Sequence, residues 1–241
     1  MDPGYVAAHI EEDRHHWWFL GRRAVLSSVL RRVLPRGALR LAEIGCGTGS
    51  LLSVSAAFGD VVGIEACPDL LEVARRSGFT VLRGSLPDDL PIEPGSLDGV
   101  LLFDVLEHIS DDRAALRAVG ELLKPGGTLV LTVPAYRWLW SPHDDALGHH
   151  RRYTARSLWR LAKGAGLQPS RTTYFNTILA LPVMGVRLLR RWRGIRSHDL
   201  FRPPAPVNAL LARIFILEAT LLRLVNFPFG VSVLLIAQRP R

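Results

Sequence analysis

Short apolar runs alternate with helix-like stretches along most of the chain. Six runs have the length and composition of strands and cover residues 38–44, 61–65, 80–82, 98–103, 127–133 and 167–176. The fourth run is almost entirely apolar, which is typical of a strand buried on both faces of a parallel sheet. A seventh strand is predicted at residues 231–237. This alternation predicts an α/β fold with a doubly wound, mostly parallel, seven-stranded sheet.

Polar residues mark where the helices between these strands begin. We expect helices at residues 50–58, 69–76 and 154–165, the last capped by Thr154. Another helix is expected after Ser110, which can cap it with Asp111 and Asp112 in its first turn. A side-chain oxygen at the N-cap accepts from unpaired N–H groups, and acids in the first turn complement the helix dipole. Sheets of this kind bind ligands at the carboxyl ends of their strands.

The segment before the last strand departs from this pattern. Within residues 209–225, three charged side chains lie five residues apart, so that no single face of a helix there is polar. Such a helix is either buried or in contact with lipid. A second stretch, residues 187–196, interleaves five arginines with leucine and tryptophan. The sequence therefore predicts a hydrophobic and basic helical insertion before the final strand.

The net charge of +8 is concentrated at the same end of the chain. Residues 171–241 carry 11 basic and 2 acidic side chains, whereas residues 1–170 are nearly neutral. Basic side chains among apolar ones favour contact with an anionic amphiphile or a membrane surface. The alternative is a helical cap packed on the domain, in which the arginine stems cover apolar surface.

Length and composition exclude several kinds of structure. The 241 residues are 48% hydrophobic and include only Cys46 and Cys67, which excludes a disulfide framework and a four-cysteine zinc site. The longest uncharged runs have 15 residues, fewer than the ~20 of a membrane-spanning helix. Acidic side chains near the start argue against a secretory signal, so we expect a cytoplasmic protein. We expect four parts: an N-terminal helical cap (1–37), a core (38–176), the insertion (177–226) and a final strand with its tail (227–241).

A glycine-rich loop follows the first predicted strand. It reads EIGCGTG from Glu43 to Gly49 and opens the next helix. Glycines let the chain turn tightly and let a ligand lie against bare backbone, and a helix N-terminus supplies unpaired N–H groups. A dinucleotide fingerprint requires a glycine where this chain has Ser50. With an acid before the glycines, the pattern suits S-adenosylmethionine, which has no pyrophosphate.

From about residue 39 to residue 135 the chain resembles class I S-adenosylmethionine-dependent methyltransferases. In that family the glycine loop holds the methionine part of the cofactor, and an acid ending the second strand binds the ribose hydroxyls. Glu65 ends the VVGIE strand and matches that acid. The resemblance implies a Rossmann-like methyltransferase sheet and S-adenosyl-L-methionine as the cofactor. It implies cofactor contacts at Glu43, Gly45, Cys46, Gly47, Gly49, Glu65, Ser85, Leu86, Asp104, Val105 and His108.

Two further segments bear on the resemblance. Ser85 stands where the family commonly has an acid that contacts adenine, which leaves Asp88 or the backbone of Leu86 as alternatives. The segment FDVLEHI, residues 103–109, resembles that of small-molecule methyltransferases, including those acting on quinone-type phenols. Enzymes that methylate amino groups of nucleic-acid bases carry an N-P-P-Y type signature there, so we expect no nucleic-acid partner. Glu107 either lies near the cofactor or braces this loop.

Histidines are the candidates for proton removal from a hydroxyl acceptor, because an imidazole with a near-neutral pKa suits a general base. His108 follows the fourth strand, and His143 and His149 lie in a long loop at the same sheet edge. We expect His149 to be the base, ahead of His108 and His143, with a hydrogen-bonded structural role as the alternative for each. The spacing of His143, Asp144 and His149 matches no recognised metal motif, so no metal is expected.

Aromatic and basic residues of the same loop are candidates for acceptor binding. The loop resembles the acceptor-side loop of a bacterial group linked to glycan or lipid modification. In that group a segment like EEDRHHWWF, residues 11–19, forms a helix over the cofactor and acceptor. For its tryptophans, a hydrophobic anchor of the terminal helix is the alternative. We expect acceptor contacts at Trp17, Trp18, Tyr136, Trp140, His150 and Arg152.

The expected function is transfer of a methyl group from S-adenosylmethionine to a hydroxyl of a small-molecule, glycan or lipid-linked acceptor, with peripheral contact to an anionic membrane. N- or C-methylation is an alternative, because an amine acceptor can lose its proton to solvent. Another alternative is a non-catalytic cofactor-binding module that uses its C-terminal region for a protein partner.

Overall fold

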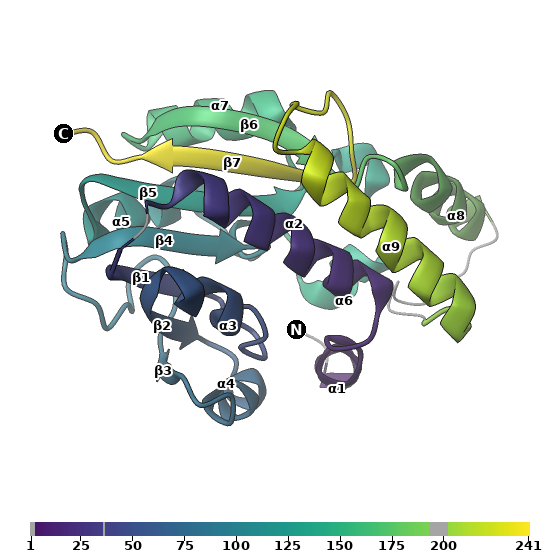
Figure 1. The fold of residues 1–241 in the computed structure, drawn as a ribbon, viewed down its shortest axis with the longest axis horizontal. Helices are drawn as coiled ribbons and strands as arrows, with labels where there is room; N and C mark the ends of the chain where they lie inside the picture. Colours follow the sequence, from purple (N-terminus) through teal and green to yellow (C-terminus); the bar gives the residue numbers. More distant parts are fainter. Residues whose placement is uncertain (1–2, 36, 193–201) are drawn as a thin grey trace.

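The computed structural model describes residues 3–35, 37–192 and 202–241, and its centre is a seven-stranded sheet (Figure 1). The strand order is β3-β2-β1-β4-β5-β7-β6. Only β7 runs antiparallel to its neighbours, whereas the pairs among β1 to β5 are parallel. The strands are β1 Leu39–Ile44, β2 Gly59–Glu65, β3 Thr80–Arg83, β4 Leu97–Phe103, β5 Leu123–Pro134, β6 Gln168–Phe175 and β7 Ser232–Gln238. This arrangement confirms the predicted doubly wound, mostly parallel sheet.

Helices cover both faces of the sheet (Figure 1). One apolar core joins the sheet to α5 and α7 through residues such as Leu116 and Leu158. The other joins it to α2 and α9 through residues such as Leu26 and Phe215. The helices are α1 Pro3–Glu12, α2 Trp17–Val33, α3 Leu52–Ser55, η1 Ala56–Phe58, α4 Pro68–Arg75, η2 Leu106–His108, α5 Asp112–Leu122, η3 Arg137–Leu139, α6 Pro142–Leu147, α7 Ala155–Gly164, α8 Ala180–Trp192 and α9 Ala205–Leu221.

Two predicted helix starts differ from the structure. The N-cap of α5 is Asp111, whose carboxylate accepts from the Ala114 N–H at 2.8 Å, so the expectation of Ser110 as the cap was wrong. The carboxylate of Asp111 reaches the N–H three residues on, where a cap must bond. The predicted helix at residues 50–58 is shorter and divided into α3 and η1, because the residues after the glycine loop first form a turn. Thr154 caps α7 as predicted and accepts from the Ser157 N–H.

The insertion between β6 and β7 forms α8 and α9, and α9 lies side by side with α2 (Figure 1). A Cβ atom at Gly21 of α2 would lie 2.1 Å from Phe215 Cδ1, so glycine is what permits the close contact between these helices. The opposite side of α9 exposes Leu210 and Leu217. Apolar side chains thus lie on both the buried and the exposed side of α9, which explains why the sequence of this helix shows no single polar face. Residues 193–196 of the basic stretch lie outside the described residues.

Within the described part of the chain, no helix has both the length and the hydropathy that a membrane span requires.

Candidate active site

The glycine loop leaves the carboxyl end of β1 and lies against the end of β4. Gly45 has φ +71°, a left-handed conformation that side chains other than glycine rarely adopt. A Cβ atom there would lie 2.3 Å from Val105 Cγ2. The N–H groups of Gly45 and Cys46 both donate to the Ile64 carbonyl, which fixes the loop to β2. The loop therefore presents bare backbone at the sheet edge where ligands bind.

Glu65, the last residue of β2, holds the other side of this loop. Its Oε2 accepts from the Gly47 N–H and its Oε1 accepts from the Cys67 N–H, each at 2.8 Å. Burial raises the pKa of Glu65, and the backbone hydrogen bonds partly oppose this effect. Each carboxylate oxygen has two lone pairs, so both can also accept from the hydroxyls of a bound sugar.

Arg22 of α2 brings a positive charge to the same place. Its Nη2 donates to the Phe103 carbonyl at 3.0 Å and forms an ion pair with Asp104 at 2.7 Å. Its Nε is buried and has no hydrogen-bond partner in the structure. Asp104 itself has φ +57°, an uncommon conformation for a residue with a side chain and one that concentrates at functional sites. An unpartnered guanidinium donor next to the bare loop fits an anionic ligand group.

The N-terminal arm closes over the glycine loop. The Asp13 carboxylate accepts from Thr48 Oγ1 at 2.7 Å and from Ser50 Oγ at 3.1 Å. Arg23 donates to the Asp13 carbonyl, which ties the arm to α2. These bonds place α1 and the start of α2 across the opening of the loop.

Together these elements surround a cavity of about 820 Å³. Its lining includes the glycine loop, Glu65 and Arg22. It also includes Glu107, His108 and His149, and apolar side chains of α8 and α9 together with Arg187. The cavity therefore combines polar groups for a cofactor with apolar side chains.

His149 is held in a defined orientation in the wall of the cavity. Its Nδ1 lies 2.8 Å from Asp144 Oδ1, and Arg152 binds the same carboxylate through Nε and Nη2. Burial alone would raise the pKa of Asp144, but the hydrogen bonds from His149 and Arg152 outweigh it and hold that pKa below its ordinary value. An ionised Asp144 accepts a hydrogen bond from Nδ1–H of the neutral imidazole, so the lone pair of His149 lies on Nε2. His149 is therefore arranged as a proton acceptor.

Local structure explains why Asp144 and His149 meet. Ser141 begins α6, and the Asp144 carboxylate accepts from the Ser141 N–H in a capping box. Gly148 ends the helix in a left-handed conformation with φ +69°. That turn brings the His149 N–H within 3.0 Å of the Asp144 carbonyl and its ring onto the Asp144 side chain. The S-P-H-D sequence followed by a glycine is the signal that could have identified this pair.

His108 and Glu107 lie beside His149. His108 Nδ1 bonds the Leu147 carbonyl at 3.1 Å, and the rings of His108 and His149 are 4.6 Å apart between centroids. Burial and the nearby His149 lower the pKa of His108 to about 4, so this imidazole is neutral at pH 7. Burial and the neighbouring Asp104 raise the pKa of Glu107 well above its ordinary value.

Comparison with known proteins identifies the family. The family model described as "Methyltransferase domain" matches residues 16–171, more than half of the chain. The chain belongs to the methyltransferase domain family. This result confirms the class I S-adenosylmethionine-dependent methyltransferase that the sequence pattern predicted.

Curated relatives of this methyltransferase are named ubiquinone biosynthesis O-methyltransferase. One from Cereibacter sphaeroides is 36% identical over 159 residues, which cover 56% of this chain and 63% of the relative. One from Xanthomonas campestris pv. campestris is 42% identical over 114 residues, 44% of this chain and 47% of the relative. The matches thus span about half to under two thirds of these relatives.

Solved structures share the fold. An S-adenosylmethionine-dependent methyltransferase of Thermotoga maritima matches with a TM-score of 0.61 and 20% identity over 98% of each chain. Phosphoethanolamine N-methyltransferase 2 of Haemonchus contortus, in complex with S-adenosyl-L-methionine, matches with a TM-score of 0.60 and 18% identity, covering 90% of this chain and 52% of that one. At these identities the comparison establishes the fold alone.

The residues of the methyltransferase fit its cofactor. The bare backbone at Gly45 and Gly47 leaves room for the methionine part, and the unpartnered Nε of Arg22 suits its carboxylate. Glu65, the acid expected to bind the ribose hydroxyls, also lines the cavity. Glu43 lies beneath the loop, accepts from Ser55 Oγ, and has its pKa raised to about 7 by burial.

The structure brings most of the expected site residues to one cavity and leaves four outside its lining. The lining includes Trp17, Trp18, Glu43, Gly45, Cys46, Gly47, Glu65, Ser85, Leu86, Asp104, Val105, His108, His143, His149 and Arg152. Gly49 packs near Leu52 and Ala74 instead. Outside the lining are also Tyr136, which stacks on Tyr174, Trp140, which donates to Asp145, and His150, which is exposed.

The lining also includes residues that the sequence did not indicate as site residues, among them Asp13, Arg22 and Asn176. Arg22 lies four residues after Trp18, and its guanidinium lies over the Trp18 ring at 5.1 Å. That helical spacing was the available signal. Asn176 follows β6, is 1% exposed, and neither atom of its side-chain amide has a hydrogen-bond partner in the structure. Its amide is thus available to a bound molecule.

Proposed function

We propose that this methyltransferase methylates a hydroxyl group of an amphiphilic acceptor, and that His149 is the general base. The observation that carries the proposal is the Asp144–His149 pair at 2.8 Å on the wall of the cavity beside the end of β4. An oriented imidazole is needed for a hydroxyl, which must lose its proton as it attacks, and is dispensable for an amine. When bound, S-adenosylmethionine supplies the methyl group and the thioether leaving group.

The chain's own residues divide the remaining work. The glycine loop, Glu65 and Arg22 bind and orient the cofactor. Asp144 fixes the tautomer and ring orientation of His149, whose Nε2 removes the hydroxyl proton of the acceptor. Trp17, Trp18 and Leu179 line the cavity and exclude water from it. Alignment of the acceptor with the methyl group and exclusion of water together lower the activation barrier by several kcal/mol. Ideal orientation by itself can lower it by about 7–11 kcal/mol.

The cavity also supports an amphiphilic acceptor. Its lining offers the unpartnered Asn176 amide to a polar head group, and Val183 and Val186 of α8 and Leu211 of α9 to an apolar tail. The relatives named ubiquinone biosynthesis O-methyltransferase add support for O-methylation of a lipid-linked ring. A glycan-linked lipid has the same combination of a polar head group with hydroxyls and an apolar tail.

The proposal is tested with S-adenosylmethionine that carries a carbon-13 methyl group. The protein is incubated with fractionated lipid and polar extracts, and the products are separated by mass and analysed by NMR. We expect a labelled product in the lipid fraction with the carbon shift of an O-methyl group. An N- or C-methyl shift would instead support the alternative acceptors, and cofactor binding without any labelled product would support a non-catalytic module.

We further propose that α8 and α9 contact an anionic lipid surface. Trp192 is 82% exposed and Leu181 is 72% exposed on α8, and Leu217 is 60% exposed on α9. The same segment holds the excess positive charge of the chain. Exposed apolar side chains in a segment whose sequence is rich in arginine suit the interface of an anionic bilayer, to which each basic residue adds about 1 kcal/mol. Docking by this face would put the apolar lining of the cavity next to the membrane.

Replacing Leu188 and Trp192 of α8 by serine is expected to weaken sedimentation with anionic vesicles at least tenfold. The reason is that burying each large apolar side chain contributes about 1.5–3 kcal/mol. High salt should weaken wild-type binding as well. Trp159→Ser is the matched control, because Trp159 is 37% exposed but lies on α7, at the other face of the sheet. Unchanged binding of the double variant, or an equal loss in the control, would contradict membrane contact through α8.

A further inference from the structure

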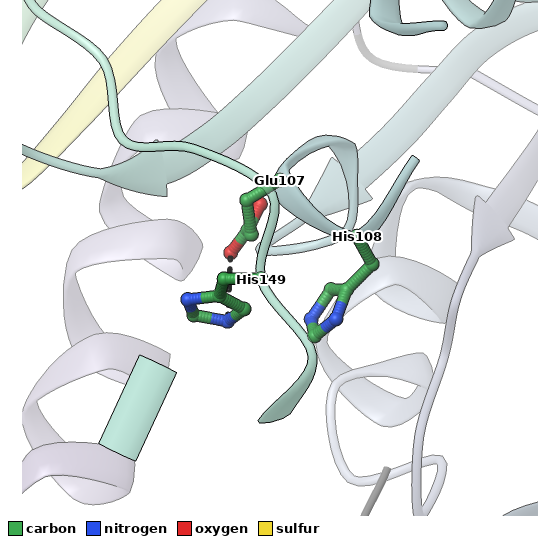
Figure 2. Close-up of side chains that lie close together, drawn as sticks. All are labelled: Glu107, His108 and His149. Carbon is green, nitrogen blue, oxygen red and sulfur yellow. Dashed lines mark ion pairs between the residues drawn. The ribbon is translucent and has the colours of Figure 1, made fainter. Parts of the chain in front are cut away.

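Three side chains with metal-ligating atoms converge beside the end of β4. Glu107 and His108 come from η2, and His149 comes from the turn after α6 (Figure 2). One ligand atom from each lies within 4.8 Å of the others, and His149 Nε2 lies 4.0 Å from Glu107 Oε1. Two metal–ligand bonds of about 2.1 Å span a similar distance. We propose that Glu107, His108 and His149 bind a divalent transition-metal ion of the Zn²⁺ class in the wall of the cavity.

The surroundings of both histidines match those of metal ligands. His149 Nδ1 bonds the Asp144 carboxylate at 2.8 Å, and His108 Nδ1 bonds the Leu147 carbonyl at 3.1 Å. Both bonds are made by the same ring atom, so both Nε2 lone pairs are left for the cluster. Histidines that bind metals almost always donate their other N–H to a carboxylate or a carbonyl in this way.

Glu107 provides an independent observation. The residue is 1% exposed, and its Oε2 has no hydrogen-bond partner in the structure. The nearby arginines form ion pairs with other carboxylates, Arg22 with Asp104 and Arg152 with Asp144. A buried carboxylate oxygen without a partner is costly. Oε1 is the oxygen that lies 4.0 Å from His149 Nε2, so a cation between the imidazoles and Glu107 would satisfy Oε2 as well when both carboxylate oxygens bind it.

The donor set selects the type of ion. Two imidazole nitrogens and one carboxylate suit Zn²⁺ and neighbouring transition metals, whereas Mg²⁺ and Ca²⁺ prefer oxygen ligands. Three protein ligands leave a coordination position open, as catalytic rather than structural zinc sites do. All three residues line the cavity, so the open position is accessible to a ligand from it.

The inference rests on the O-methylation part of the proposed function and replaces its other part, the assignment of His149 as the general base. The ion would bind the acceptor oxygen and lower the pKa of its hydroxyl, as zinc does for bound water. The proton leaves to solvent, the oxygen–methyl bond forms as the sulfur–methyl bond breaks, and the electron pair of the broken bond stays on sulfur. With the ion bound, His149 Nε2 is a ligand, and the ion replaces the imidazole as the agent of proton removal.

Metal binding is measured directly on the full chain after treatment with a chelator and dialysis. Zn²⁺ is titrated by calorimetry, and Co²⁺ by its visible absorption. We expect one ion per chain, an absorption spectrum typical of nitrogen and oxygen ligands, and a higher melting temperature with Zn²⁺. Glu107→Gln and His149→Gln should each lower the affinity at least tenfold. His150→Gln is the matched control for affinity, because it removes the adjacent, exposed imidazole from the same loop.

Methyl transfer by the metal-free and the reconstituted protein separates this inference from the proposed function. Failure to bind either ion, or equal affinity in the Glu107→Gln, His149→Gln and His150→Gln variants, overturns the metal site. If metal-free protein then transfers methyl groups at the full rate, the proposed function stands with His149 as the base. If the ion binds at these residues but no extract yields a methylated product, the site stands and the proposed function fails.

Discussion

Gly45→Ala is expected to lower the affinity for S-adenosylmethionine about 30- to 150-fold. Its φ of +71° disfavours any side chain by about 1–2 kcal/mol, and the new Cβ would lie 2.3 Å from Val105 Cγ2. Relief of that overlap costs about 1 kcal/mol or more and must move the glycine loop away from the end of β4. A total of about 2–3 kcal/mol corresponds to the expected change in affinity. Calorimetric titration with S-adenosylmethionine and S-adenosylhomocysteine measures it.

The chain offers a close control for backbone strain. Gly95 has φ +66°, but a Cβ atom there would meet nothing within 4 Å. Gly95→Ala should therefore cost about 1 kcal/mol of stability and leave cofactor affinity unchanged. If the overlap with Val105 is the cause, adding Val105→Ala to Gly45→Ala should restore part of the affinity. Wild-type affinity in Gly45→Ala would refute the assignment of this loop to the cofactor.

His149→Ala is expected to lower kcat by about 10²–10⁴ while cofactor affinity stays within a factor of about two. General acid–base catalysis contributes about this much, and a metal ligand removed from the same position would give a loss of similar size. In the proposed site the glycine loop, Glu65 and Arg22 hold the cofactor, whereas the His149 side chain bonds the Asp144 carboxylate. Single-turnover rates, together with a separate binding titration, distinguish the two effects.

His143→Ala serves for comparison, because His143 lines the same cavity on the neighbouring helix α6. The Asp144 carboxylate orients the ring of His149. His143 is the residue that precedes Asp144 in the chain and is not the ring that this carboxylate orients, so we expect loss of the His143 side chain to change kcat less than tenfold. A larger loss in His143→Ala than in His149→Ala would reassign the base. A loss of cofactor affinity in His149→Ala that matches the loss of rate would instead give His149 a binding role.

The Gly45 variants and the His149 variants test two parts of the site. The surroundings of Gly45 could be predicted from the sequence more fully than those of His149. Gly45 and Glu65 were identified from the sequence because each follows directly from its own strand, and parallel neighbouring strands bring their carboxyl ends together. In the structure the Glu65 carboxylate, at the end of β2, accepts a hydrogen bond from the Gly47 N–H in the loop that follows β1. His149 was predicted as the base, but Asp144 was considered only as a metal ligand with His143 and His149, a site that was not expected, and the capping box that joins Asp144 to His149 was missed.

Long-range packing decided which loop residues reach the cavity. Tyr136 and Trp140 looked suitable for acceptor binding because the loop is rich in aromatic residues. Tyr136 instead stacks on Tyr174 of β6, and Trp140 donates to Asp145. Composition indicates that such a loop has a role, but only the surrounding strands determine where each ring points.

The sequence by itself determined the strands, the order of strands and helices, and the cofactor loop, because hydrophobic periodicity and glycine geometry act over a few neighbouring residues. Only the tertiary structure placed Asp13 on that loop and Arg22 at the end of β4, and only it assembled Glu107 and His108 with His149. These contacts join residues that lie 35 or more positions apart in the chain. They depend on how α2, α6 and the sheet pack against one another, and no local pattern specifies that packing.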